Sequence, residues 1–330
     1  MRALLLSMLL ATPSVAWSTP AAPPNAGWPQ PRQGLSNRAF ATLRLPRQGK
    51  AESWRFRAGS HVWGYQPGMS VWSSAAIARV GDEAIVVAGS YDKSIYCLDA
   101  LSGRKRWRYT TGGGVYAAPT IWHEITTAGG KTTTRSWVFA SSSDRIVYAI
   151  DANLGRRRWS TSVQSWRPTI GGARLSSPTV GRAQGAAAVF FGHWVWDKSL
   201  KGHLQAGGVT ALAATSGKRL WTTRLGDSQL SDPRVLPAEA RRRDPRHKGA
   251  RGGMVFIASE NGNLYALDAE TGQERWAQPQ RNVIKASPAL FFHGGSWRVV
   301  IGSKHGMVRC YDAETGKLRW SYKTGHWVDS

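Results

Sequence analysis

The stretch ALDAETGQERW, residues 266–276, decides the fold because the chain repeats it. A nearly identical string, CYDAETGKLRW, stands at 310–320, and looser copies occupy 97–107, 149–159 and 211–221. The five copies align without gaps: Ala or Cys at the first position, Gly at the seventh and Trp at the eleventh. Recurrence about every 50 residues indicates an array of similar structural units.

The flanks of each copy repeat as well. A β-rich run such as MVFIAS (254–259) precedes each string, a short alternating run such as WSYKTG (320–325) follows its Trp, and a segment such as SSPTV (176–180) opens the next unit. Each unit therefore contains four short strands separated by turn signals. Repeated four-stranded antiparallel units are typical of the blades of a β-propeller.

The repeated string has a structural explanation. An Asp at the third position accepts backbone N–H groups in the turn, and the Gly supplies a positive φ. The Trp buries ~150–250 Å², and we expect it to lie over small Ala, Cys and Gly positions and join one blade to the next. The predicted docking residues are Trp107, Trp159, Trp221, Trp276, Trp320, Gly103, Gly155, Gly217, Gly272, Gly316, Asp99, Asp151, Asp268 and Asp312, with Ala213 in place of Asp in the third copy.

Charge and the N-terminus indicate where such a protein works. Lys and Arg number 44 against 20 Asp and Glu, for a formal net charge of +24, which favours anionic partners. Arg2, the apolar run 3–11 and small residues up to Ala16 (or Ala22) predict a signal peptide and a secreted or periplasmic protein. No Cys follows that run, so we expect no lipid attachment there. We expect no transmembrane segment and no specific nucleic-acid partner.

The remaining chain divides into a Pro-rich basic arm at 17–50 and a propeller at 51–330. Cys97 and Cys310 share the first position of the string, where the other copies have Ala. That position favours small buried side chains over a disulfide.

YALDAETGQERW together with SSPTV resembles the repeat of the PQQ-binding-like β-propeller family, within the quinoprotein alcohol dehydrogenase-like superfamily. The resemblance covers residues 27–330 and implies an all-β propeller; it also extends to the propeller lipoprotein of the outer-membrane β-barrel assembly machinery. We count about five complete four-stranded blades, at 71–112, 116–164, 174–225, 230–280 and 285–325. An extra N-terminal strand is expected at 54–59. A closed ring, an open arc and a shortened array stay open.

The resemblance names PQQ as a cofactor, but the chain lacks the adjacent Cys pair and the acidic Ca²⁺ cluster of the dehydrogenases and any C-x-x-C-H haem motif. We therefore predict no catalytic residues, no metal site and no firm cofactor. The sequence favours a non-catalytic binding or scaffold module of the envelope. The alternative is a fragment or subunit of a PQQ-dependent alcohol or sugar dehydrogenase.

Two irregular segments are candidate binding sites, because loops on a rigid frame carry function. The first joins cations to aromatic side chains, which suits a planar anion, a sugar or an acidic peptide; covering a blade edge is the competing interpretation. This predicted rim consists of Trp166, Arg167, Arg174, Trp194, Trp196, Asp197, Lys198 and His203.

The second segment, 238–253, is strongly basic and is expected to project from the opposite end of the blades. It suits anionic lipid head groups or envelope polysaccharide, and a solvated loop is the competing interpretation. Its predicted polyanion-binding residues are Arg241, Arg242, Arg243, Arg246, Lys248 and Arg251.

Overall fold

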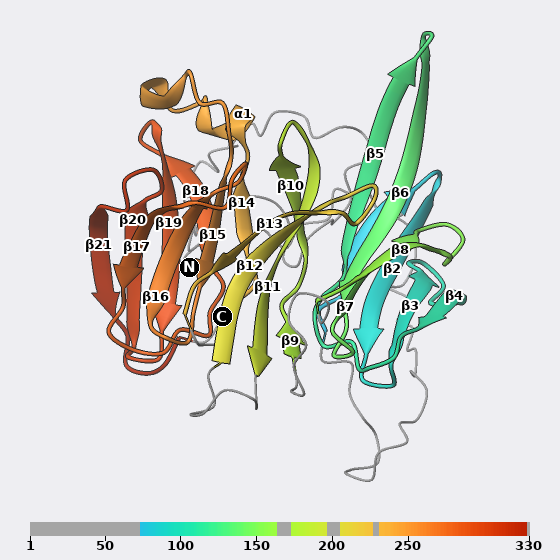
Figure 1. Ribbon diagram of the computed structural model, residues 1–330, viewed down its shortest axis with the longest axis horizontal. Helices are drawn as coiled ribbons and strands as arrows, with labels where there is room; N and C mark the ends of the chain where they lie inside the picture. Colours follow the sequence, from blue (N-terminus) through green and yellow to red (C-terminus); the bar gives the residue numbers. More distant parts are fainter. Residues whose placement is uncertain (1–72, 164–172, 197–204, 227–230, 329–330) are drawn as a thin grey trace, which may run out of the picture.

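Each of the five repeated strings spans the end of the third strand, the following turn and the start of the fourth strand of one antiparallel sheet (Figure 1). The computed structural model describes residues 73–163, 173–196, 205–226 and 231–328. The signal peptide, the basic arm and the strand expected at 54–59 lie outside these residues. Within them the protein is almost entirely β, as the sequence predicts.

Each sheet follows the chain as a simple meander of four strands, so we call the sheets blades 1 to 5. Blade 1 contains β1 (Ala76–Val80), β2 (Glu83–Ser90), β3 (Ser94–Asp99) and β4 (Lys105–Thr110). Blade 2 contains β5 (Thr120–Ala128), β6 (Lys131–Ser141), β7 (Ile146–Asp151) and β8 (Arg157–Ser162). Blade 3 contains β10 (Thr179–Ala183), β11 (Ala186–Trp196), β12 (Gln205–Ala213) and β13 (Arg219–Arg224), and the short β9 (Ala173–Leu175) also pairs with β11.

Blade 4 contains β14 (Arg234–Leu236), β15 (Met254–Ala258), β16 (Asn263–Asp268) and β17 (Glu274–Pro279). Blade 5 contains β18 (Ala289–His293), β19 (Ser296–Ser303), β20 (Met307–Asp312) and β21 (Leu318–Lys323). The described residues hold one α-helix, α1 (Ala238–Arg241), and one 3-10 helix, η2 (Pro245–His247). None of the described helices is long and apolar enough to cross a membrane.

The first four tryptophans of the repeated string lie between consecutive blades, whereas no described blade follows that of Trp320. Each of the first four donates its indole N–H to the carbonyl of the Ala after the motif's third position in the next blade. The Nε1–O distances are 2.8 Å (Trp107–Ala152), 2.8 Å (Trp159–Ala214), 3.0 Å (Trp221–Ala269) and 3.1 Å (Trp276–Ala313). Trp320, in the last described blade, is 45% exposed.

Two features of the structure require glycine at the seventh position of the string, and Gly272 shows both. Its φ is +76°, and a Cβ added to it would lie 2.6 Å from the ring of Trp221. Gly155, Gly217 and Gly316 meet Trp107, Trp159 and Trp276 in the same way. A side chain at this position would therefore strain the turn and displace the indole.

In the four strings that have it, the Asp stabilises its own turn; the third string has Ala213 instead. Asp99 Oδ1 accepts the backbone N–H groups of Leu101 and Ser102, at 3.1 and 2.7 Å. Asp151, Asp268 and Asp312 do the same in their turns. Each string also contains a register shift one residue after its first position, which brings the Trp opposite the small Ala or Cys. Cys97 and Cys310 are both buried and free, so the prediction of small buried side chains is confirmed.

A second set of contacts joins the blades at or just before their first strands. Thr120 donates to the carbonyl of Pro178 at 2.5 Å, and Thr179 donates to that of Pro233 at 2.9 Å. Asp232 accepts the N–H of Ser177 at 2.7 Å, and its own N–H donates to Ser287 Oγ at 3.2 Å. The Ser-Pro and Asp-Pro segments thus link blades 2 to 5 in series.

Candidate functional site

Arg174 and Trp194 are the members of the predicted rim whose side chains the structure describes. They face each other across the β9–β11 pair, where Arg174 is exposed and Trp194 is half-buried. Trp196 ends β11, and its side chain is outside the description. Trp166, Arg167, Asp197, Lys198 and His203 lie outside the described residues, so the rest of the rim stays a prediction.

Two tyrosines that sequence reasoning missed lie close to this pair. The rings of Tyr91 and Tyr116 meet edge to face with centroids 4.8 Å apart, and Tyr116 is 40% exposed. Burial and the hydrogen bond to Tyr91 raise the pKa of Tyr116 to about 12, while the charge of Arg174 opposes that rise. Tyr91 lies in the β2–β3 turn of blade 1 and Tyr116 in the connection from β4 to β5, so no local motif pointed to them. Aromatic rings beside a cation are chemically suited to a planar anion.

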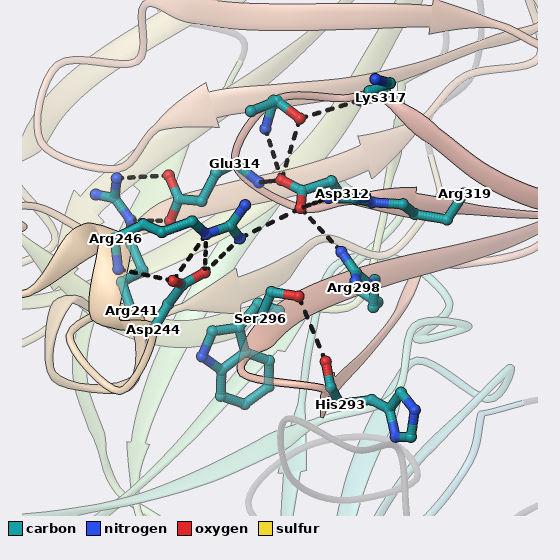
Figure 2. Close-up of polar contacts among 12 residues, drawn as sticks. Arg241, Asp244, Arg246, His293, Ser296, Arg298, Asp312, Glu314, Lys317 and Arg319 are labelled. Atoms are coloured by element: carbon teal, nitrogen blue, oxygen red, sulfur yellow. Dashed lines mark hydrogen bonds and ion pairs between the residues drawn. The ribbon is translucent and has the colours of Figure 1, made fainter.

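The basic segment 238–253 forms α1 and η2 and packs on blade 5 (Figure 2). Trp297 donates its indole N–H to Ala240 O at 2.7 Å. Arg241 is buried and makes a bidentate ion pair with Glu314, with Nε–Oε1 and Nη2–Oε2 distances of 2.6 and 2.8 Å. A planar guanidinium on a carboxylate in this geometry fixes orientation as well as charge. The segment, which leaves blade 4 between β14 and β15, therefore holds blade 4 against blade 5.

Asp312 is the centre of a second group of ion pairs in the same region (Figure 2). It accepts Arg319 at 2.7 Å, Arg298 at 2.9 Å and Arg246 at 3.3 Å, and Arg246 also pairs with Asp244 at 2.6 Å. Burial opposes ionisation of Asp312, but the hydrogen bonds from Arg319 and Thr315 outweigh it and hold its pKa well below the usual range. Asp312 is therefore charged at neutral pH.

Part of this network was visible in the sequence. In three strings the Asp pairs with the Arg seven residues later: Asp151 with Arg158, Asp268 with Arg275, and Asp312 with Arg319. That spacing recurs and was a usable signal. Arg241 and Glu314 are 73 residues apart. Glu314 belongs to the fifth string, but Arg241 lies in an insertion outside the repeat, so no spacing rule joins them.

The other four cations of the segment remain at its surface. Arg242, Arg243, Lys248 and Arg251 are exposed, and Arg242 donates to Ala250 O at 3.0 Å. Arg241 and Arg246 are engaged with internal carboxylates. An external anion would therefore meet Arg243, Lys248 and Arg251 most directly.

Comparison with known proteins decides the family. A family model described as outer membrane protein assembly factor BamB, of the PQQ-like repeat class, matches residues 47–202 and 205–329. The chain belongs to this family. This BamB-like chain is 24% identical over 268 residues to the serine/threonine-protein kinase AfsK of Streptomyces coelicolor, covering 77% of the chain and 24% of the kinase. It is 25% identical over 219 residues to the outer membrane protein assembly factor BamB of Yersinia pestis, covering 63% of the chain and 47% of that protein.

Among solved structures, the chain resembles a europium-containing methanol dehydrogenase. The TM-score is 0.54 at 16% identity, over 90% of this chain and 58% of that one. At this identity the likeness is one of fold. The BamB-like chain spans about a quarter of the length of the kinase AfsK and about half of the length of the Yersinia pestis BamB.

The superfamily implies a PQQ cofactor with a bound Ca²⁺. The two cysteines lie on β3 and β20, in blades 1 and 5, and burial raises the pKa of Cys97 to about 12. In the described part of the chain, no three His, Cys, Asp or Glu side chains are grouped to hold a metal ion. The described residues therefore do not fit a Ca²⁺–PQQ pair.

Proposed function

We propose that this BamB-like propeller is a non-catalytic binding or scaffold module of the bacterial envelope, exported by its N-terminal segment. The observation that carries the proposal is the family match over most of the chain. The use of the motif's polar groups supports it: the Asp carboxylates stabilise turns and the indole N–H groups join blades. The polar groups of the repeat thus stabilise a rigid frame, and frames of this kind present binding surfaces on their loops.

The partners proposed are envelope proteins, by analogy with the BamB relative, whose name describes outer membrane protein assembly. Affinity purification of the tagged full chain from solubilised envelopes of its own host tests this. Stoichiometric recovery of an outer-membrane β-barrel or one of its assembly proteins, lost when the tagged chain is unfolded first, is the expected result. Recovery of no partner, together with turnover in an alcohol or sugar oxidation assay, would reject the scaffold.

A PQQ-dependent oxidoreductase fragment or subunit is the alternative, and the family resemblance is its whole support. Titration of the purified chain with PQQ and Ca²⁺ tests it separately. A saturable absorbance change with a rise in Tm would revive it, and the absence of both would remove it.

A further inference from the structure

The turns of the repeated string share one end of the blades with the long β5–β6 hairpin. Because neighbouring strands in each blade run antiparallel, the turn between the first and second strands and the turn between the third and fourth leave from the same end. The hairpin β5–β6 and helix α1 both extend from that end (Figure 1). Trp107, which rests on Gly155, holds the string turns of blades 1 and 2 together.

This end of blades 1 and 2 is strongly basic. Four exposed cations follow directly after the two motif glycines, two per turn, and two more stand on β6. The exposed acids at this end of the two blades are Asp82 and Glu83, and Glu83 pairs with Arg106. The six cations are Arg104, Lys105, Lys131, Arg135, Arg156 and Arg157.

Large apolar side chains are exposed among these cations. Leu101 is 54% exposed, Leu154 is 61% exposed and Ile125 on β5 is 50% exposed. Leu154 is informative because it replaces a hydroxyl: at the same position Ser102, Thr271 and Thr315 donate to the Asp of their turns. The turn itself favours Ser or Thr at this position, so the stability of the turn does not account for Leu154.

We propose that this surface binds the headgroup region of an anionic phospholipid bilayer, a role beyond the scaffold function. We call it the turn patch: Leu101, Arg104, Lys105, Leu154, Arg156 and Arg157. Interfacial binding combines apolar side chains that enter the headgroup–acyl boundary with cations that meet lipid phosphates. A nucleic acid or a polysaccharide would use the cations but would gain nothing from the exposed leucines.

The test is co-sedimentation of the full chain with vesicles of phosphatidylcholine containing 30% phosphatidylglycerol, beside vesicles of phosphatidylcholine alone. We expect binding to the anionic vesicles, weakened by high salt because the Debye length shortens. The double variant Arg156→Gln/Arg157→Gln should bind about thirtyfold more weakly. All variants keep the same N-terminus, so differences between them report the turns.

A matched control removes two exposed cations from the other end of the blades. Arg281→Gln/Lys323→Gln has the same net charge as the turn variant, and both of its positions are exposed. We expect its binding to change less than about threefold. Equal losses in the two double variants would show a general charge effect and overturn the proposal.

Leu154→Thr separates lipid from other anions. It restores the hydroxyl used by the other turns, so the fold should be retained, with an unchanged circular dichroism spectrum and Tm. Vesicle binding should fall about threefold to tenfold. Three results would each overturn the proposal. The first is vesicle binding that Leu154→Thr leaves unchanged, and the second is equal binding with and without phosphatidylglycerol. The third is tighter binding to a 20-base-pair DNA duplex with an affinity that Leu154→Thr does not change.

Discussion

Substituting Gly272 by Ala tests the docking of one blade on the next. Gly272 has a φ of +76°, and its added Cβ would lie 2.6 Å from both the Trp221 ring and Thr223 Oγ1. The positive φ costs Ala about 1–2 kcal/mol. The forced separation from the indole adds about 1–3 kcal/mol, as overpacking does in well-packed cores.

Gly185 provides the matched control. Its φ is +74°, and nothing lies within 4 Å of an added Cβ. Gly185→Ala should therefore cost the conformational part alone, about 1–2 kcal/mol. The difference between the two variants isolates the contact between blades 3 and 4.

Urea unfolding at 25 °C, followed by circular dichroism, measures both free energies. A mutant cycle adds the decisive step. In a Trp221→Ala/Thr223→Ala background, which removes both side chains near the added Cβ, Gly272→Ala should cost no more than Gly185→Ala does. If Gly272→Ala and Gly185→Ala destabilise the protein equally, or if the extra penalty persists without these two side chains, the docking argument is wrong.

Three further predictions follow from burial and pairing. Trp320→Ala should lower the unfolding free energy by about 1 kcal/mol, against about 3–5 kcal/mol for Trp221→Ala, because Trp320 is 45% exposed and Trp221 9%; equal urea midpoint shifts would contradict this. Arg241→Met should lower the unfolding free energy by about 3–5 kcal/mol because it leaves Glu314 buried and unpaired. Adding Glu314→Leu should recover most of that stability in the same urea assay, and no recovery would refute the pairing. Burial lowers the pKa of His193 from 6.5 to about 4, so the unfolded chain takes up a proton at higher pH than the folded one. The unfolding free energy should therefore fall by about 2 kcal/mol from pH 7 to pH 4.5. If a His193→Gln variant shows the same dependence of stability on pH, this reasoning is wrong.

The fold was predictable because its signals are local. A turn of Asp, Gly and Trp is specified within eleven residues, and repeating it five times fixed the number of described blades and the order of their strands. The spacing of Asp312 and Arg319 was visible too. The burial of Arg241 was not, because an irregular insertion has no period and its partner lies in another blade.

The sequence by itself determined the secondary structure, the turns and the presence of a repeated frame, since these depend on neighbours along the chain. The tertiary structure decided which surfaces are covered. It placed each indole against the next blade, left Trp320 with an exposed ring, folded the basic segment on blade 5 and gathered Leu101 and Leu154 with cations at one end. Exposure and charge pairing depend on how whole sheets are positioned, which no short stretch encodes.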